Sequence, residues 1–255
     1  MHEPVGYIYS QIQKNIIWCR LKVVQLHFVN WQRDISIEVF EDCKVVIKRN
    51  KTLKDLHEYL LISSYTMMSI LLAHPDRPPL AIRFMSVKNE SFEMRQYLTE
   101  IGIPTPRLLL ITNKSLIEQF IEGGNLYQAF LNGKDSHLAF QAGSMTGRLH
   151  NVGYAFIDNK AENYLLNSEN SIVRTDLGFI QRNSSVFARS MDVGSFLASV
   201  MDLETSRYRA IQQAFLNGYK SEIEGAIPYL SLIIRNILSL GFSSDQLRMF
   251  KNMLE

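Results

Sequence analysis

Glycine is nearly missing from the first part of this chain, where the first 80 residues contain one glycine, Gly6. A glycine-rich G-x-G-x-x-G loop over a bound phosphate therefore does not lie there. The G-x-x-x-x-G-K-[ST] motif is missing from the whole sequence, which excludes the P-loop NTPases. Backbone amides can still cradle a phosphate without these glycines, because an anion-binding turn needs only suitable geometry.

Charge, cysteine and long apolar runs are also scarce. The net charge of +2 is small and no basic run alternates with aromatic residues, so we expect no nucleic-acid partner. With two cysteines, Cys19 and Cys43, and no secretion signal, a disulfide framework is not expected. No stretch has the roughly twenty apolar residues that a transmembrane helix needs, and the six histidines are scattered. These absences predict a cytoplasmic protein without a metal-spaced Cys/His cluster.

A chain of 255 residues with 46% hydrophobic residues can bury one large core or two modest ones. Alternating patterns predict a three-stranded meander at 21–29, 35–40 and 44–48. An apolar helix is predicted at 56–73, within an insertion at about 51–74, and its apolar residues on nearly all sides predict burial between two layers. Alternatively, its methionine-rich surface could contact a partner, a second copy or a membrane surface. Further helices are predicted at 189–201, 205–219, 223–240 and 243–254.

Two acids and an amide follow a spacing suited to phosphoryl transfer. Asp158 precedes Asn163 by five positions, and Asp176-Leu177-Gly178 follows. Such a reaction needs one carboxylate to orient an acceptor hydroxyl, and an amide with a second carboxylate to hold Mg²⁺ on the phosphates. The alternative is two solvated loops, since Asp, Asn and Gly are common turn residues.

The surrounding pattern favours a site. A helix with a buried face at Leu138, Ala142, Met145 and Leu149 is predicted before the first acid, and Gly153 can end it. Short strands at 164–166 and 171–174, joined by a turn at 167–170, are predicted between the amide and the second acid. This layout is expected to bring the three residues together.

With this motif the chain resembles the protein-kinase-like superfamily. It is most similar to small atypical members: aminoglycoside and choline-type phosphotransferases, lipopolysaccharide kinases and RIO-type kinases. The resemblance covers about residues 90 to 200. Its further pieces are Glu93 to Leu98 with Gly102-Ile103-Pro104, the segment 116–123, and Gly147-Arg148-Leu149-His150 before Gly153. Phe156 and Ile157 replace the His and Arg of the family motif.

The resemblance implies an α+β, protein-kinase-like two-lobed fold. A small β-rich N-lobe with the helical insertion would span 1–120, and a larger helical C-lobe with the catalytic and metal loops would span 121–255. ATP and Mg²⁺ would be the cofactors, in a cleft between the lobes.

The implied residue roles follow the family motif. Asp158 would orient the acceptor, with Lys160 beside it as a second catalytic residue, and the metal ligands would be Asn163 and Asp176. Lys48 would contact the phosphates, because 44–48 resembles the V-A-I-K strand. Gln119, Phe120 and Ile121 would bind ATP at the hinge. The partner acid of Lys48 would be Glu93, with Glu90 as the fallback.

Two other interpretations of the phosphate contact remain open at this point. Lys48 could be an exposed lysine on an edge strand. Arg83 is the rival cation, although its planar fork is no equivalent of an ammonium group.

Asp192 resembles the buried acid with which the family braces the catalytic loop, or else it is an acid of the first helical turn. Asp192 follows Asp176 by only sixteen positions, and no A-P-E follows. Such a short segment favours a small-molecule, sugar or lipid-linked acceptor over a protein. Aromatic residues of the carboxyl-terminal segments could line its site, or simply pack in the core; they are Tyr208, Phe215, Tyr219 and Tyr229.

Three classes of function therefore remain in view. The first is a phosphotransferase on such an acceptor, with an atypical protein kinase as its variant. The second is a pseudokinase that serves as a nucleotide-binding or scaffold module. The third is an unrelated α+β domain with a chance motif.

Overall fold

The computed structural model describes residues 33–40, 43–50, 54–78, 88–112, 114–133 and 136–239. Helices and small antiparallel sheets make up these ranges, so the expectation of a mixed α+β protein is confirmed. Three predicted features lie outside the described residues: the strand at 21–29, the helix at 243–254 and the cation Arg83.

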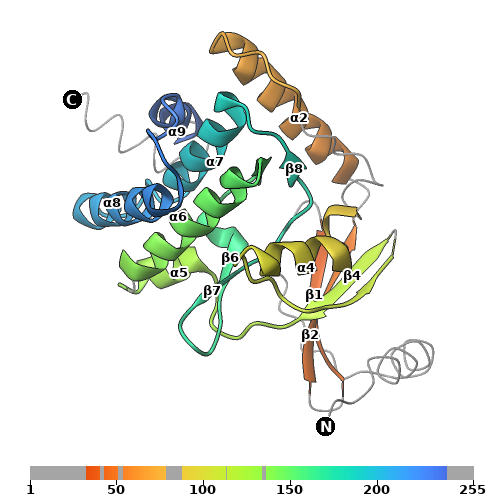
Figure 1. The fold of residues 1–255 in the computed structure, drawn as a ribbon. Coiled ribbons are helices and arrows are strands. Elements are labelled where there is room, and N and C mark those ends of the chain that lie inside the picture. Colours follow the sequence, from red (N-terminus) through yellow and green to blue (C-terminus); the bar gives the residue numbers. More distant parts are fainter. Residues whose placement is uncertain are drawn as a thin grey trace. The chain divides into compact units, whose positions relative to one another are not determined.

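The chain divides into two compact units, and Figure 1 labels the elements of both. One unit comprises Met1–His57 and Arg107–Phe120, and the other comprises Glu58–Pro106 and Ile121–Glu255. Helix α4 (Phe92–Glu100), which was expected in the amino-terminal lobe, groups with the second unit.

The first unit holds an antiparallel sheet in the order β1-β2-β4-β3. The strands are β1 (Arg33–Phe40), β2 (Cys43–Asn50), β3 (Leu108–Ile111) and β4 (Ser115–Gln119). Val45 and Ile47 of β2 are buried together with Ile117 of β4, as expected where every second side chain of a strand lies on one face. The predicted strands at 35–40 and 44–48 are confirmed.

The second unit is mainly helical. Its α-helices include α2 (Lys54–Leu71, from Glu58 onward), α4, α5 (Leu126–Leu131), α6 (Ser136–Asn151), α7 (Val186–Ala198), α8 (Thr205–Glu222) and α9 (Ser231–Ser239). Two short antiparallel pairs lie among them: β5 (Tyr154–Ala155) with β8 (Gln181–Arg182), and β6 (Tyr164–Leu166) with β7 (Ile172–Arg174). The predicted helix before Asp158 and the predicted hairpin after it are therefore confirmed.

The prediction of one helical segment at 223–240 was wrong. Helix α8 ends at Glu222 and α9 begins only at Ser231. Between them Gly225 adopts a φ of 127°, which residues with a Cβ rarely adopt, and Pro228 has no amide hydrogen for a helical hydrogen bond.

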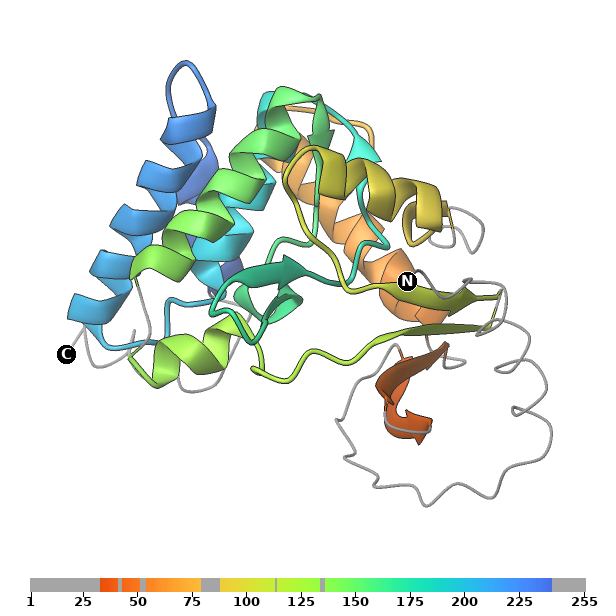
Figure 2. The ribbon, with the colours of Figure 1, turned by 60° about the horizontal axis from the view of Figure 1, so that its bottom comes forward.

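Helices α6 and α8 run side by side in both Figures 1 and 2, and glycines let their backbones touch. A Cβ atom built on Gly143 of α6 would stand 1.9 Å from the carbonyl oxygen of Phe215, and one on Gly218 of α8 would stand 2.0 Å from that of Phe140. Both distances are far below van der Waals contact. No larger residue fits at either glycine without moving a helix.

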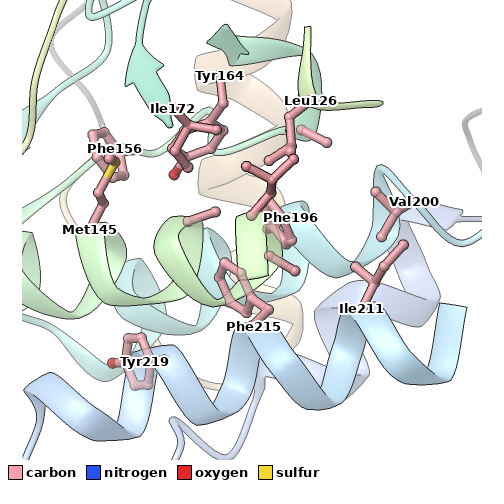
Figure 3. Close-up of a cluster of buried hydrophobic side chains, with 14 of the residues drawn as sticks. Leu126, Met145, Phe156, Tyr164, Ile172, Phe196, Val200, Ile211, Phe215 and Tyr219 are labelled. Atoms are coloured by element: carbon pink, nitrogen blue, oxygen red, sulfur yellow. The ribbon is translucent and has the colours of Figure 1, made fainter. Parts of the chain in front are cut away.

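Close approach of these helices builds the main core of the second unit, shown in Figure 3. Phe215 projects from α8 toward Phe196 of α7, and the two rings stack with centroids 4.0 Å apart, while Ile211 of α8 lies near Val200. Tyr164 and Ile172 of the β6–β7 hairpin belong to the same cluster. The hairpin that carries the acid loops is thus anchored in the largest core of the unit.

Helix α2 packs on α7 and α9 with one face only. Tyr65 and Met68 are buried there, and the ring of Tyr65 meets that of Phe187 edge to face at 4.8 Å. On the opposite face Met67 and Ile70 are each 60% exposed, so the expected burial between two layers was wrong. An apolar periodicity on all sides cannot distinguish burial on one face from burial on two. In the described part of the chain, no helix is long and apolar enough to cross a membrane.

The carboxylate of Asp76, which lies after α2, accepts hydrogen bonds from the loop before α7. Oδ2 of Asp76 accepts hydrogen bonds from the hydroxyl of Tyr65 at 2.5 Å, from Nδ2 of Asn183 at 2.8 Å and from Oγ of Ser185 at 2.8 Å. Ser185 is also the N-cap of α7. The end of α2 and the start of α7 are thus held as one assembly.

Candidate functional site

The loop that carries Asp158 follows β5 and has a strained backbone. Ile157 adopts a φ of 67°, which is a genuine outlier for a β-branched residue and costs about 1–3 kcal/mol. Asp192 compensates: its Oδ2 accepts from the amide of Phe156 at 2.7 Å, and its Oδ1 accepts from the amide of Ile157 at 2.6 Å. Asp192 therefore braces this loop, as the resemblance implied. It lies well inside α7 and not in its first turn.

A fully buried polar network supports Asp192 in turn. Nε2 of His150 lies 3.0 Å from Oδ2 of Asp192, and Nδ1 of His150 lies 2.9 Å from the hydroxyl of Tyr219. Asn159 donates to the carbonyl of Asp192 and accepts from the hydroxyl of Tyr164. The position of Asp158 is therefore fixed through its neighbours Ile157 and Asn159.

The carboxylate of Asp158 pairs with Lys160. Nζ of Lys160 lies 2.7 Å from Oδ1 of Asp158, and 31% of the lysine side chain is exposed. Burial disfavours the charge of Lys160, but attraction to Asp158, and then to Glu162 and Asp176, outweighs burial and raises the pKa of Lys160. An ammonium group thus stands among the acids of both loops.

Asn163 ends a short 3-10 helix, η1 (Ala161–Asn163), directly after this pair. Its Nδ2 donates to the carbonyl oxygen of Asp158 at 2.9 Å, which turns the amide oxygen to the other side. The amide of Thr175 donates to the carbonyl of Asn163 at 2.9 Å and so ties Asn163 to the residue before Asp176. Asp176 itself has a φ of 57°, a second left-handed residue in the cluster. The structure therefore brings Asp158, Lys160, Asn163 and Asp176 into one cluster of loops.

Two buried residues hold the loop of Asp176: Glu90, which the sequence suggested only as a fallback partner of Lys48, and Asn89, which the sequence did not suggest. Oε1 of Glu90 accepts from the amide of Leu177 at 3.1 Å, and Glu90 also pairs with Arg95 at 2.8 Å. Nδ2 of Asn89 donates to the carbonyl oxygens of Gly178 and Ile180 at 2.9 and 2.7 Å. Both side chains are buried just before α4. Contacts across nearly ninety residues of sequence leave no local pattern, so no sequence signal could have identified these bonds to the loop of Asp176.

Glu93, the predicted partner of Lys48, is exposed in the first turn of α4. A hydrogen bond from its own backbone, followed by one from Ser91, lowers the pKa of its carboxyl group. Glu90, the fallback, is 1% exposed. Of the two acids, Glu90 is the one that is buried and accepts a hydrogen bond from the loop of Asp176.

Lys48 lies in the first unit on β2, between β1 and β4. It is buried and its Nζ lies 2.6 Å from Oε1 of Glu118, so the interpretation as an exposed edge lysine was wrong. Of the predicted hinge residues, Gln119 is exposed at the end of β4 and its amide donates to the carbonyl of Arg107. The amide of Phe120 donates to the carbonyl oxygen of Lys44. Ile121 is half-buried and begins the segment Ile121–Glu255, which belongs to the second unit.

Most of the aromatic residues expected along an acceptor site are core residues. Phe215 and Tyr219 are fully buried, and Tyr208 is half-buried with its hydroxyl bonded to Arg235. Tyr229, 64% exposed, is the exception. For Phe215 and Tyr219 the interpretation as acceptor walls was wrong, because the close approach of α6 and α8 encloses them.

The oxygen donors of the cluster suit Mg²⁺. This ion prefers oxygen ligands and is usually held by one or two carboxylates together with substrate phosphates and water. Asp176 and the amide oxygen of Asn163 offer such ligands, and Asp158 lies beside them. Among the described residues, no group of three or more His, Cys, Asp or Glu side chains could hold a metal ion by itself. An ion held by Asn163 and Asp176 would therefore need further oxygen ligands from outside these side chains.

Comparison with known proteins finds no matching family model and no significantly similar curated protein. Functional assignment therefore depends on the geometry of the two loops.

Proposed function

We propose that this protein is an ATP- and Mg²⁺-dependent phosphotransferase that acts on a hydroxyl group of a small-molecule, sugar or lipid-linked acceptor. The observation that carries this proposal is the cluster of Asp158, Lys160, Asn163 and Asp176 on two strained, braced loops. Strained residues persist only where surrounding contacts hold them, and they concentrate at functional sites.

In the reaction, the acceptor oxygen forms a bond to the γ-phosphorus while the bond from that phosphorus to the β–γ bridging oxygen breaks, and ADP leaves. Asp158 orients the acceptor hydroxyl and takes its proton, which then passes to solvent. Lys160, held 2.7 Å from Asp158, supplies positive charge next to the transferring group. Bound Mg²⁺ would neutralise phosphate charge, and the side chains of Asn163 and Asp176 would hold it.

The remaining roles are predictions within this proposal. Lys48 would contact the phosphates, and Gln119, Phe120 and Ile121 would bind the nucleotide base. Glu90 replaces Glu93 as the acid that supports the phosphate side, because Glu90 is buried and bonded to Leu177. In a test of these roles, Lys48→Met should weaken ATP binding and Glu93→Gln should not.

The acceptor class follows from the short segment between Asp176 and Asp192. The fifteen residues between them contain β8 and the start of α7, and the side chains of Asn183 and Ser185 are bonded to Asp76. Such a segment offers little surface for docking a peptide, which favours a small acceptor. A protein acceptor is the variant that the assay must exclude.

Thermal denaturation of the full chain with ATP, with and without Mg²⁺, tests the nucleotide site. At one hundred times Kd, a ligand stabilises by about 2.7 kcal/mol, which raises Tm by roughly 5–11 °C for a chain of this size. The Mg²⁺-dependent part of the shift should disappear in Asp176→Ala. Glu169→Gln, an exposed change in the β6–β7 turn, is the matched control and should behave as wild type.

Turnover separates an enzyme from a binding module. Labelled ATP is offered with a panel of sugars, amino alcohols and generic proteins. Asp158→Ala should bind Mg²⁺ and ATP like wild type but transfer no label. The absence of a thermal shift with any nucleotide would refute the proposal. Binding without transfer, unchanged by Asp158→Ala, would instead identify a pseudokinase, and exclusive labelling of protein would identify a protein kinase.

A further inference from the structure

Arg174 places a positive charge at a buried strand position, where an apolar side chain is usual. All three residues of β7 are buried, and the first two, Ile172 and Val173, are apolar. The third is Arg174, which is 0% exposed and the largest fully buried side chain among the described residues. Taking a guanidinium group out of water is costly, and a well-packed apolar side chain often serves stability as well or better. The bonds that this guanidinium group makes must therefore account for an arginine at this position.

The guanidinium group of Arg174 contacts the backbone of both predicted functional residues beside it. Its Nη2 donates to the carbonyl oxygen of Asp158 at 2.8 Å, and its Nη1 donates to that of Asn163 at 2.8 Å. Within the described chain its Nε has no hydrogen-bond partner, and no carboxylate forms an ion pair with it. The positive charge of Arg174 is therefore compensated by the dipoles of two backbone carbonyl groups and by two aromatic rings, and its donors are directed at the two loops.

Two aromatic rings fix the plane of this group. Its Cζ lies 4.6 Å from the ring centroid of Phe156 and 5.0 Å from that of Tyr164. Both distances are within the range of cation–π attraction. The fork of Arg174 is thus held rigidly, and so is the separation of the two carbonyl groups that it joins.

This arrangement also accounts for a departure in the motif. In the sequence pattern, Phe156 stands where the related kinases have histidine, and its ring here forms one side of the arginine clamp. Phe156, two positions before Asp158, and Arg174, two positions before Asp176, are therefore in contact although they are 18 positions apart.

We propose that Arg174 is a positioning residue, whose guanidinium group sets the distance between the acceptor-orienting Asp158 and the metal ligand Asn163. This role rests on the proposed phosphotransferase function. Lysine at 174 keeps the charge but cannot bond two carbonyl groups in a fixed plane or stack in the same way. A small displacement of reacting groups lowers turnover much more than it lowers nucleotide binding.

The test compares Arg174→Lys and Arg174→Met with wild type, as full-length proteins. The matched control is Arg148→Lys, since Arg148 also uses two arms, one to Glu222 and one to the carbonyl of Gly102, away from the loops. Release of ADP from Mg²⁺ and ATP, with water as acceptor, gives kcat and KM. Hydrogen exchange of peptides that cover 157–165 and 174–177 reports loop order without any need for activity.

Arg174→Lys should keep a folded circular dichroism spectrum, lose roughly 10- to 100-fold in kcat and change KM for ATP less than about threefold. Exchange in the two peptides should rise by about tenfold, as for one lost hydrogen bond, while the control changes neither reading. Wild-type kcat together with wild-type exchange in Arg174→Lys would overturn the proposal. If the wild-type protein neither binds nor hydrolyses ATP, the proposed function fails. The exchange comparison still decides in that case, because unchanged exchange would refute the clamp.

Discussion

The brace at Asp192 leads to the sharpest prediction on stability. The change is Asp192→Asn, which keeps the shape of the side chain and replaces one carboxylate oxygen by an amide NH₂ group. In the native structure the two oxygens accept from the amides of Phe156 and Ile157, and one also lies next to Nε2 of His150. At least one of these buried donors must then face another donor.

The size of the effect follows from those contacts. A hydrogen bond to a charged group contributes about 1.5–3 kcal/mol, and a buried donor left unsatisfied costs about 1–3 kcal/mol. Relaxation of the strained Ile157 would return about 1–3 kcal/mol. From the middle of each range the net loss is about 2 kcal/mol, or roughly 4–8 °C in Tm for a protein of this size.

Calorimetry and hydrogen exchange provide the assay. Asp192→Asn should melt lower than wild type, and exchange should increase most strongly in the peptide that covers 155–159. Asp202→Asn removes an exposed acid that accepts from Tyr127 and serves as the control, with little change in Tm. A melting temperature of Asp192→Asn equal to that of wild type would show that the carboxylate does not brace the loop.

Two further predictions concern packing and pH. Gly143→Ala should lower the free energy of unfolding by about 1–3 kcal/mol or more, because the new Cβ would stand 1.9 Å from the carbonyl oxygen of Phe215. Helix propensity alone predicts that alanine stabilises α6. A higher Tm of Gly143→Ala would therefore contradict the contact between α6 and α8. Lys160 has a pKa above its ordinary value of 10.5, so its contribution to stability is present below pH 10.5 and is lost as the pH rises through the raised value. Urea denaturation at pH 8 and pH 11 should therefore show a larger destabilisation by Lys160→Met at pH 8, and equal losses at both would refute the pairing.

Local features of the fold were predictable from the sequence. Helix α6 follows from apolar residues three and four apart, such as Leu138 and Ala142, and the β6–β7 hairpin follows from a turn at Asn167. The proximity of Asp158 and Asn163 needed only this local layout. Where an apolar pattern covered all sides, as in α2, the sequence could not show which face is buried.

The residues that position the site were not predictable in the same way. Asn89 and Glu90 reach the loop of Asp176 across nearly ninety positions, which only tertiary structure determines. Arg174 follows two β-branched residues and resembles an ordinary charged residue at the end of a strand. Its burial depends on the rings of Phe156 and Tyr164, and no rule of periodicity joins those three positions.

The bonds at Asp76 have a consequence for synthesis of the chain on the ribosome. Ser185, one partner of Asp76, lies 109 residues later in the chain. At about 5–20 residues per second, roughly 5–20 s pass before that partner has been added. During this interval Tyr65 and Met68 of α2 have neither α7 nor α9 to cover them. The nascent chain therefore presents an uncovered apolar helix, the kind of segment that chaperones bind, and α2 can pack fully only after α7 and α9 have been made.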